Sequence, residues 1–485
     1  MAMGTRKQRE RQEELWVTHA ELATGPGHPF YTRLNELLEQ EKFDEFAEAE
    51  CARFYAEMGR PSLTPGTYFR LLLIGYFEGI DSERGIAWRA ADSLGLRQFL
   101  RVGLDEETPD HSTISRTRRL IDVETHRKVF LWVLGLLADR GLLKGKTVGV
   151  DATTLEANAA MRSIVRRDNG ASYEEFLREL AKQSGIETPS REDLARVDRK
   201  RKRKKKTSNE EWMSPSDPDA RVAKMKDGTT HLAHKAEHAV DMETGAVIAV
   251  TLQAADQGDT TTLRETLAET AENVAQLIER EAEKAPAEDP QVSLTPLAEI
   301  VADKGYHSSE MVLALQQAET RSYIPEPKRP HRKWAGKTAE QKAVYANRRR
   351  VKGGYGNRLL KKRGELIERS FAHCYETGAM RRVYLRGHEN VLKRQLIHVG
   401  AFNLSLIFRQ KLGAGTPRGL RNLQQEVVFV ILSFTISCET IADAIVDVTG
   451  AFRHRVGVIS RSLHRNCRCQ FSRVPPQAVR YFGSS

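Results

Sequence analysis

The chain has 485 residues, a length that at roughly 150 residues per domain predicts about three domains, or one large domain with insertions. Hydrophobic residues make up 40% and charged residues 29%, a composition that excludes collagen-like, disulfide-rich and wholly disordered proteins. The 76 Lys and Arg residues outnumber the 65 Asp and Glu residues, so the net charge is +11, which favours a polyanionic partner.

The first part of the chain is predicted to be a loose arm followed by helices. Residues 1–28 are polar and contain a Gly-Pro-Gly stretch at 25–27, so we expect a flexible arm. From residue 29 to residue 145, apolar residues recur at helical spacing, as in Phe69, Leu72, Leu73 and Tyr76. An all-α region over 29–145 follows from this pattern.

One helix of this region has the side chains of a DNA-binding element. Asp110 is placed to cap a helix that presents hydroxyl and guanidinium groups, from Ser112, Ser115, Arg116 and Arg119. Such groups suit contacts to phosphates and base edges. The segment fits a helix-turn-helix unit, and it equally fits an ordinary amphipathic surface helix.

The pattern changes at Lys146, where an α/β domain begins that we extend to residue 410. We expect a strand at 147–150 ending in Asp151, a hairpin over 231–253, a helix capped by Asp259, a strand at 297–302 ending in Asp303, a helix from Ser308, a strand at 321–324 and a helical stretch from 359 to 409. This order predicts a mixed sheet with antiparallel and parallel strands.

Two basic segments interrupt this domain. Residues 163–228 are too many for an ordinary loop, and they include eight consecutive basic residues, Arg199–Lys206, which favour a mobile tract that touches DNA non-specifically. Residues 328–363 hold fourteen Lys or Arg against one acid, Glu340, so the surplus charge is local. We expect a DNA-backbone surface there and just beyond it, with Lys328, Arg329, Arg332, Arg348, Arg349, Arg363 and Arg369 as candidate contacts.

A carboxylate ends each of two predicted strands, at Asp151 and at Asp303. A strand end fixes a side chain on a rigid element beside the crevice where α/β proteins bind ligands. Hard divalent cations bind carboxylate oxygens, and two such cations about 3.5–4 Å apart assist phosphoryl transfer. The simpler interpretation is that each Asp is a turn residue or a helix cap.

Short motifs around these residues resemble, in the same order, those of bacterial insertion-sequence transposases of the DDE class. The likeness spans roughly residues 29–410. The motifs are Pro109-Asp-His-Ser-Thr-Ile-Ser-Arg116, Asp151-Ala-Thr-Thr-Leu-Glu-Ala-Asn158, Asp217-Pro-Asp-Ala-Arg221, Ala302-Asp-Lys-Gly-Tyr-His-Ser308, Ile367-Glu-Arg-Ser-Phe371, Leu385-Arg-Gly-His-Glu-Asn390 and Phe402-Asn-Leu404.

The resemblance implies a ribonuclease-H-like catalytic core that binds two divalent cations, magnesium or manganese, through Asp, Asp and Glu. In this chain those residues are Asp151, Asp303 and Glu368. It also implies cleavage at the ends of an insertion sequence, strand transfer into target DNA, and homo-oligomers on paired double-stranded ends. Two alternatives stay open: a catalytically silent DNA-binding relative, and a metal-dependent nuclease without strand transfer.

The third ligand is the least determined part of this site. Glu365 shares a helix face with Glu368, and the Glu-x-x-Phe match favours Glu368, while Glu376 and Glu389 lie farther along an expected continuous helix. Position 364 is Gly and position 375 is Tyr, where many relatives have basic residues, so Arg363 and Arg369 are alternative DNA-positioning groups. Residues 411–485 carry no motif of the family.

Neither membrane insertion nor secretion is indicated. The longest apolar run, residues 427–437, is shorter than the ~20 residues that cross a bilayer, and no apolar stretch follows the charged N-terminus. Five cysteines in so long a chain form no disulfide framework. We therefore expect a cytoplasmic, bacterial protein that associates with the nucleoid when bound to DNA and has no membrane partner.

Overall fold

The computed structural model describes residues 27–56, 58–59, 62–201, 208–225, 228–284, 292–293, 296–328, 334–423 and 425. By their contacts, residues 1–417 form one unit and residues 418–485 another. Nearly all of the predicted arm and most of the predicted C-terminal segment therefore lie outside the described residues. Within the described part of the chain, no helix is both long and apolar enough to span a membrane.

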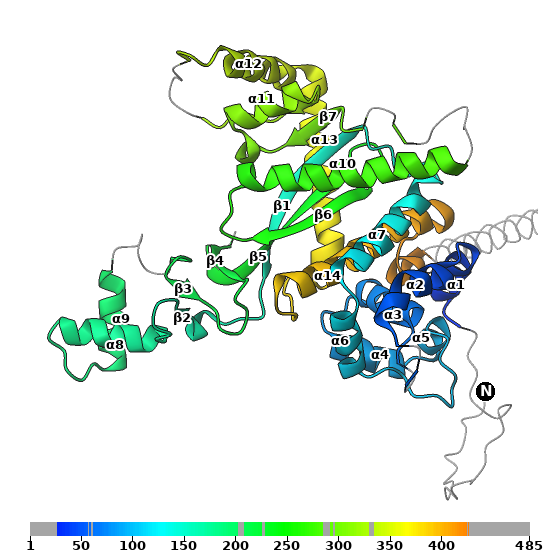
Figure 1. Cartoon of the computed structure of the whole chain (residues 1–485), viewed down its shortest axis with the longest axis horizontal. Helices are drawn as coiled ribbons and strands as arrows, with labels where there is room; N and C mark the ends of the chain where they lie inside the picture. The colour runs from blue at the N-terminus through cyan, green and yellow to red at the C-terminus, as the bar shows by residue number, and fades with distance from the viewer. Residues whose placement is uncertain are drawn as a thin grey trace, which may run out of the picture. The chain divides into compact units, whose positions relative to one another are not determined.

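The first described segment is helical, as its apolar spacing predicts. Side chains of Ser82, Ser93, Asp110 and Asp122 cap four of its helices by accepting backbone N–H groups. The helices are α1 (Pro29–Gln40), α2 (Phe43–Cys51), α3 (Pro65–Phe77), α4 (Glu83–Ala91), α5 (Leu94–Phe99), α6 (His111–Leu120) and α7 (Val123–Ala138), with a short 3-10 turn at Ala52–Phe54. Helix α14 (His388–Leu412), from the far end of the domain, packs against α3 and α7, so the helical region and the α/β region share one core (Figure 1).

The α/β region is built on a mixed sheet, which confirms the predicted arrangement. Strand β5 pairs antiparallel with β1, β4 and β6, while β7 and β8 continue the sheet parallel to β1. The strands are β1 (Thr147–Glu156), β4 (Arg221–Lys224), β5 (Thr230–Asp241), β6 (Val247–Ala254), β7 (Glu299–Ala302) and β8 (Arg321–Tyr323). The predicted end of the first strand at Asp151 is wrong, because β1 stays paired with β5 as far as Glu156. Its parallel pairing with β7 stops where Val150 is opposite Ala302, so Asp151, midway along β1, lies near Asp303, which follows β7.

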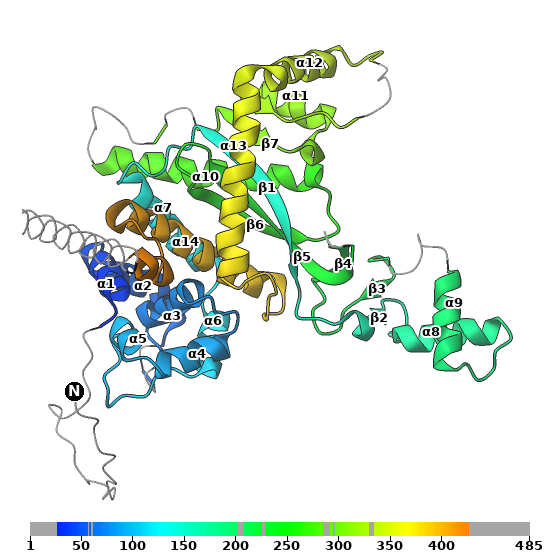
Figure 2. The same cartoon turned by 180° about the vertical axis from the view of Figure 1, so that it is seen from behind.

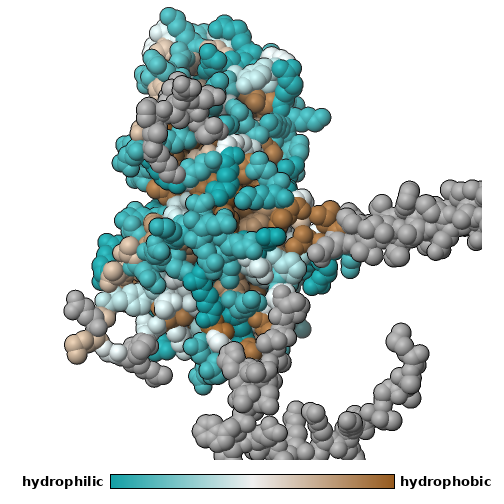
Figure 3. Space-filling view, turned by 90° about the vertical axis from the view of Figure 1, so that its right-hand side faces the viewer, coloured by the Kyte–Doolittle hydropathy of each residue, from teal (hydrophilic) through white to brown (hydrophobic). Residues whose placement is uncertain are grey.

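Helices cover both faces of this sheet. Helix α10 (Asp259–Lys284) packs on β5 and β6, and helix α13 (Gly354–Phe371) crosses β1, β7 and β8 on the opposite face (Figures 1 and 2). Helices α11 (Ser309–Gln317) and α12 (Thr338–Lys352) pack on each other beside β8. At the end formed by α11 and α12, hydrophilic side chains predominate on the face shown in Figure 3.

The predicted insertion between β1 and β5 has its own small core. Helices α8 (Tyr173–Gln183) and α9 (Arg191–Lys200) pack together, and strands β2 (Val165–Arg166) and β3 (Trp212–Met213) form a second sheet. Trp212 is buried among apolar residues there, which explains how so polar a segment holds a fold. The basic run is described only over 199–201.

The prediction of one long helical stretch over 359–409 is wrong. Helix α13 ends at Phe371 and continues as a π-helical turn, Ala372–Thr377, and residues 378–387 separate this turn from α14. The break contains backbone in the left-handed region, at Ala379 (φ 61°) and Gly387 (φ 82°), which a continuous helix excludes. Positions of Glu376 and Glu389 therefore cannot be counted along one helix from Glu368.

Candidate active site

Asp151 projects from β1 toward helix α13. Its Oδ1 accepts the N–H of Ala152 at 2.9 Å, and its Oδ2 lies 2.7 Å from Nη1 of Arg363. Burial, and to a lesser degree the charge of Asp303, raise the pKa of Asp151 above its usual value, against the opposing effect of Arg363. The carboxylates of Asp151 and Asp303 therefore interact electrostatically, as their strand register requires.

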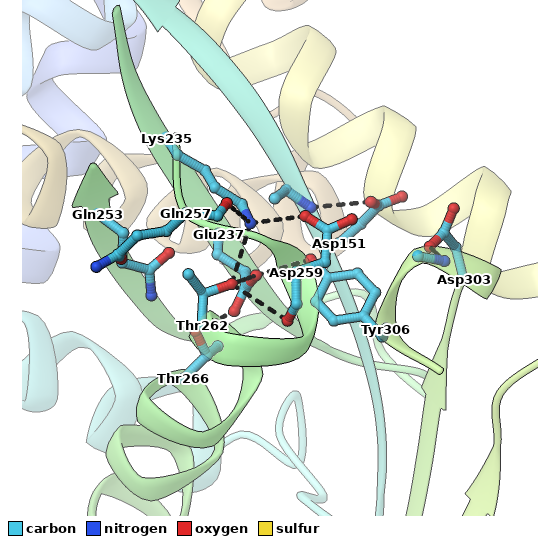
Figure 4. Close-up of polar contacts among 12 residues, drawn as sticks. Asp151, Lys235, Glu237, Gln253, Gln257, Asp259, Thr262, Thr266, Asp303 and Tyr306 are labelled. Atoms are coloured by element: carbon cyan, nitrogen blue, oxygen red, sulfur yellow. Dashed lines mark hydrogen bonds and ion pairs between the residues drawn. The ribbon is translucent and has the colours of Figure 1, made fainter. Parts of the chain in front are cut away.

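Asp303 follows β7 and begins the 3-10 turn Lys304–Tyr306. Its Oδ1 accepts the N–H of Gly305 at 2.5 Å, so the capping role that we considered as the simpler interpretation is present. The cap also orients the carboxylate just after the end of β7, near the point on β1 that carries Asp151 (Figure 4). Capping and a functional role are thus compatible here.

A buried tyrosine ties this turn to the strand beside Asp151. Tyr306 is fully buried, and its hydroxyl donates to Oε1 of Glu237 at 2.7 Å. Burial and the charge of Glu237 raise the pKa of Tyr306 well above its usual value, so the hydroxyl is a donor at neutral pH. Glu237 lies on β5 opposite Ala152, and it also accepts hydroxyls of Thr262 and Thr266 from α10 (Figure 4).

Another acid, Asp259, lies beside this turn. Its Oδ1 accepts from Nζ of Lys235 at 2.6 Å, and the buried lysine also donates to Thr262 at 3.0 Å. A Cβ placed on Gly305 would collide with Oδ2 of Asp259 and crowd Oδ1 of Asp303, so the glycine permits this approach. From the sequence we predicted only a helix cap at Asp259, because Lys235 is 24 residues away on another element.

Glu368 is not joined to the two aspartates. It follows the buried Ile367 on α13, so at 3.6 residues per turn its side chain points about 100° away from that residue, and it is exposed. Among the described residues, no three His, Cys, Asp or Glu side chains are arranged to hold a metal ion. The competing Glu365 is also exposed and pairs with Arg369 at 2.8 Å.

An apolar side chain anchors the end of this helix. Phe371 is buried, and its ring lies 4.8 Å from that of His238, the residue opposite Asp151 on β5. A hydrogen bond of 3.1 Å joins Nδ1 of His238 to Oγ of Ser370. Two contacts therefore fix the last turn of α13 against the strand next to Asp151.

The candidate DNA contacts occupy different environments. On α6, Ser112, Arg116 and Arg119 are exposed, whereas Ser115 is half-buried. Lys328 and Arg349 are exposed, Arg348 pairs with Glu326 at 2.7 Å, and Arg369 and Arg363 pair with acids as described above. Arg329 and Arg332 lie outside the described residues.

The Asp217-Pro-Asp-Ala-Arg221 motif has a structural role. Asp217 is buried, lies 3.1 Å from Nε2 of His234 and accepts the N–H of Gly387, while Asp219 accepts the N–H of His388 at 2.9 Å. Both carboxylates thus satisfy backbone donors at the start of α14. The insertion is thereby connected to the helix that runs into the N-terminal region.

Two family models match the chain, one over most of the N-terminal helices and one over most of the α/β region. The model of a family described as "Transposase DDE domain" matches residues 197–443, just over half the chain, and that of "Transposase domain (DUF772)" matches residues 19–120. The first match contains Asp303 and Glu368 and begins after Asp151. No curated protein and no solved structure matches the chain.

Proposed function

The chain belongs to the transposase DDE domain family, and on that premise we propose that it cleaves DNA at insertion-sequence ends and transfers the freed strands into target DNA. The observation that carries the proposal is the proximity of Asp151, midway along β1, and Asp303, which follows β7, just beyond the point where the two parallel strands stop pairing. Rigid strands hold such carboxylates within the narrow geometry that catalysis needs.

The proposed catalytic domain is a ribonuclease-H-like core over residues 146–410, with the basic insertion 163–228. The mixed sheet and its helices on both faces support this assignment. Residues 29–145 form the proposed DNA-binding region, which is supported by the exposed hydroxyl and guanidinium groups of α6. The shared core of α3, α7 and α14 would transmit the orientation of bound DNA to the catalytic domain.

The donor set fits divalent cations. Carboxylate oxygens are the ligands that magnesium and manganese prefer, and a bound cation offsets the repulsion between Asp151 and Asp303. In the proposed site Asp151, Asp303 and Glu368 would hold two such cations. When bound, cations of this kind stabilise the attacking and leaving oxygens of an in-line displacement at phosphorus.

The chain's own residues position the substrate and the ligands. Tyr306 and Glu237 hold the turn of Asp303, and Phe371 and His238 hold the last turn of α13. Arg358, Lys361 and Lys362 are exposed on α13 and supply charge for the phosphate backbone near Glu368. The proposal includes homo-oligomers on paired ends and a cytoplasmic protein that is nucleoid-associated when DNA-bound.

Cleavage of DNA that carries the element's own ends tests this function. Asp151→Asn and Asp303→Asn should each abolish magnesium-dependent cleavage and leave DNA affinity nearly intact, because an amide does not replace an ionised ligand. Cleavage at near wild-type rate in either variant would reject the site. Joined products separate a transposase from a nuclease without strand transfer, and absence of any cut by the wild-type chain identifies a catalytically silent relative.

A further inference from the structure

Arg363 bears on how the active site binds a cation, because its side chain ends on Asp151. Its Nη1 lies 2.7 Å from Oδ2 of Asp151 and 3.4 Å from the carbonyl oxygen of Val150. The side chain is only 14% exposed. Gly149 leaves room for this approach, since a Cβ there would lie 3.2 Å from Cγ of Arg363.

Resting on the proposed function, we infer that Arg363 is an internal counter-ion that occupies the cation's place on Asp151 and lowers the divalent-cation affinity of the DNA-free protein. Among the described residues, Arg363 is the one basic side chain that forms an ion pair with Asp151, and Asp303 has none. A guanidinium cation 2.7 Å from Oδ2 of Asp151 neutralises the carboxylate and repels a second cation brought to it. Cation binding at Asp151 is therefore weakened while Arg363 stays in place.

The ion pair has the geometry of a replaceable contact. One Nη atom reaches one carboxylate oxygen, whereas the strongest guanidinium–carboxylate pairs are bidentate. The Nε–H of Arg363 is buried and has no hydrogen-bond acceptor among the residues that the structure describes. Asp151 thus satisfies only part of the hydrogen-bonding capacity of this guanidinium.

The same helix offers the guanidinium an alternative partner. Arg358, Lys361 and Lys362 are exposed on α13, so a DNA backbone attracted to this helix brings phosphates close to Arg363. A Cβ placed on the adjacent Gly364 would meet no atom within 4 Å, so this part of the surface of α13 is open to a large ligand such as DNA. DNA binding would then release Asp151, and cation binding would become coupled to the presence of substrate.

Manganese binding to the full chain without DNA tests this inference, with free Mn²⁺ measured by electron paramagnetic resonance. Arg363→Met should bind Mn²⁺ at least tenfold more tightly than the wild-type chain, and Asp151→Asn should remove that binding. Arg140→Met is the matched control, because Arg140 forms a half-buried ion pair with Glu41 at 2.6 Å outside the site. Its Mn²⁺ affinity should equal that of the wild-type chain.

Whether Arg363→Met binds Mn²⁺ more tightly or more weakly than the wild-type chain decides between two roles of Arg363. If Arg363 merely supports Asp151, Arg363→Met will bind Mn²⁺ equally or more weakly, and the counter-ion role is overturned. Arg363→Gln, which keeps a hydrogen-bond donor without the charge, should also bind more tightly, and it replaces Arg363→Met if circular dichroism shows that the latter is unfolded. Absence of Asp151-dependent Mn²⁺ binding in all variants would instead reject the proposed function itself.

Discussion

Replacement of Tyr306 by Phe tests whether the turn after β7 positions Asp303. The change removes the hydroxyl that donates to Glu237 at 2.7 Å and leaves the ring in place. Glu237 is buried and loses one of its three hydroxyl donors, from Tyr306, Thr262 and Thr266. A hydrogen bond to a charged group contributes about 1.5–3 kcal/mol, so we expect the free energy of unfolding to fall by that amount.

The functional effect should appear in the cation requirement. Burial raises the pKa of Glu237, the three hydroxyls oppose that shift, and loss of the Tyr306 donor frees the 3-10 turn that carries Asp303. A less constrained Asp303 loses pre-organisation, so cleavage should need several-fold more magnesium for half-maximal rate, with the rate recovering at saturating magnesium.

A second tyrosine provides a matched control. Tyr323 donates to the buried carboxylate of Glu299 at 3.1 Å, and Glu299 lies at the opposite end of β7 from Asp303. Tyr323→Phe should cost similar stability, measured by urea unfolding, without changing the magnesium requirement. Equal magnesium dependence of cleavage in the two variants would refute the positioning role of Tyr306.

Three further outcomes can be measured on the same chain. Glu368→Gln should fold, bind DNA and fail to cleave. Glu365→Gln should keep its activity, because the carboxylate of Glu365 is paired with Arg369. The reverse pattern would transfer the catalytic role to Glu365. Non-specific DNA affinity should fall with salt at a log–log slope of about −0.9 per phosphate neutralised, and Arg116→Ala with Arg119→Ala should lower preference for element ends more than bulk affinity. An unchanged preference in filter-binding competition would remove α6 from recognition. Burial lowers the pKa of His126, His238 and His398 from 6.5 to about 3, so these side chains stay neutral in the folded protein and become protonated in the unfolded chain. The free energy of unfolding should therefore be highest above pH 6.5 and fall by about 1.4 kcal/mol per pH unit for each histidine as the pH drops toward 3. Equal urea midpoints at pH 7 and pH 5 would contradict this.

The sequence alone was sufficient for most of the local elements and for the proximity of Asp151 and Asp303. Apolar periodicity and capping residues are local signals, so the helix after Asp110, the hairpin, the strand before Asp303 and the start of β1 were predictable. The continuation of β1 past Asp151 to Glu156 was not, because it depends on pairing with β5. Two paired parallel strands bring residues at matching positions together whatever their separation in sequence, which is why the proximity of the two aspartates was predictable.

Contacts between distant elements were decided only by the tertiary structure. Arg363 meets Asp151 across 212 residues, and Tyr306 meets Glu237 across 69, because sheet register and helix packing bring these side chains together. The break between α13 and α14 depends on left-handed backbone that the surrounding packing holds in place. The apolar spacing of the sequence therefore predicted a helix that was too long. Glu368 shows the same limit: its spacing along the helix was readable from the sequence, but the direction of its side chain relative to the sheet depends on which face of α13 is buried.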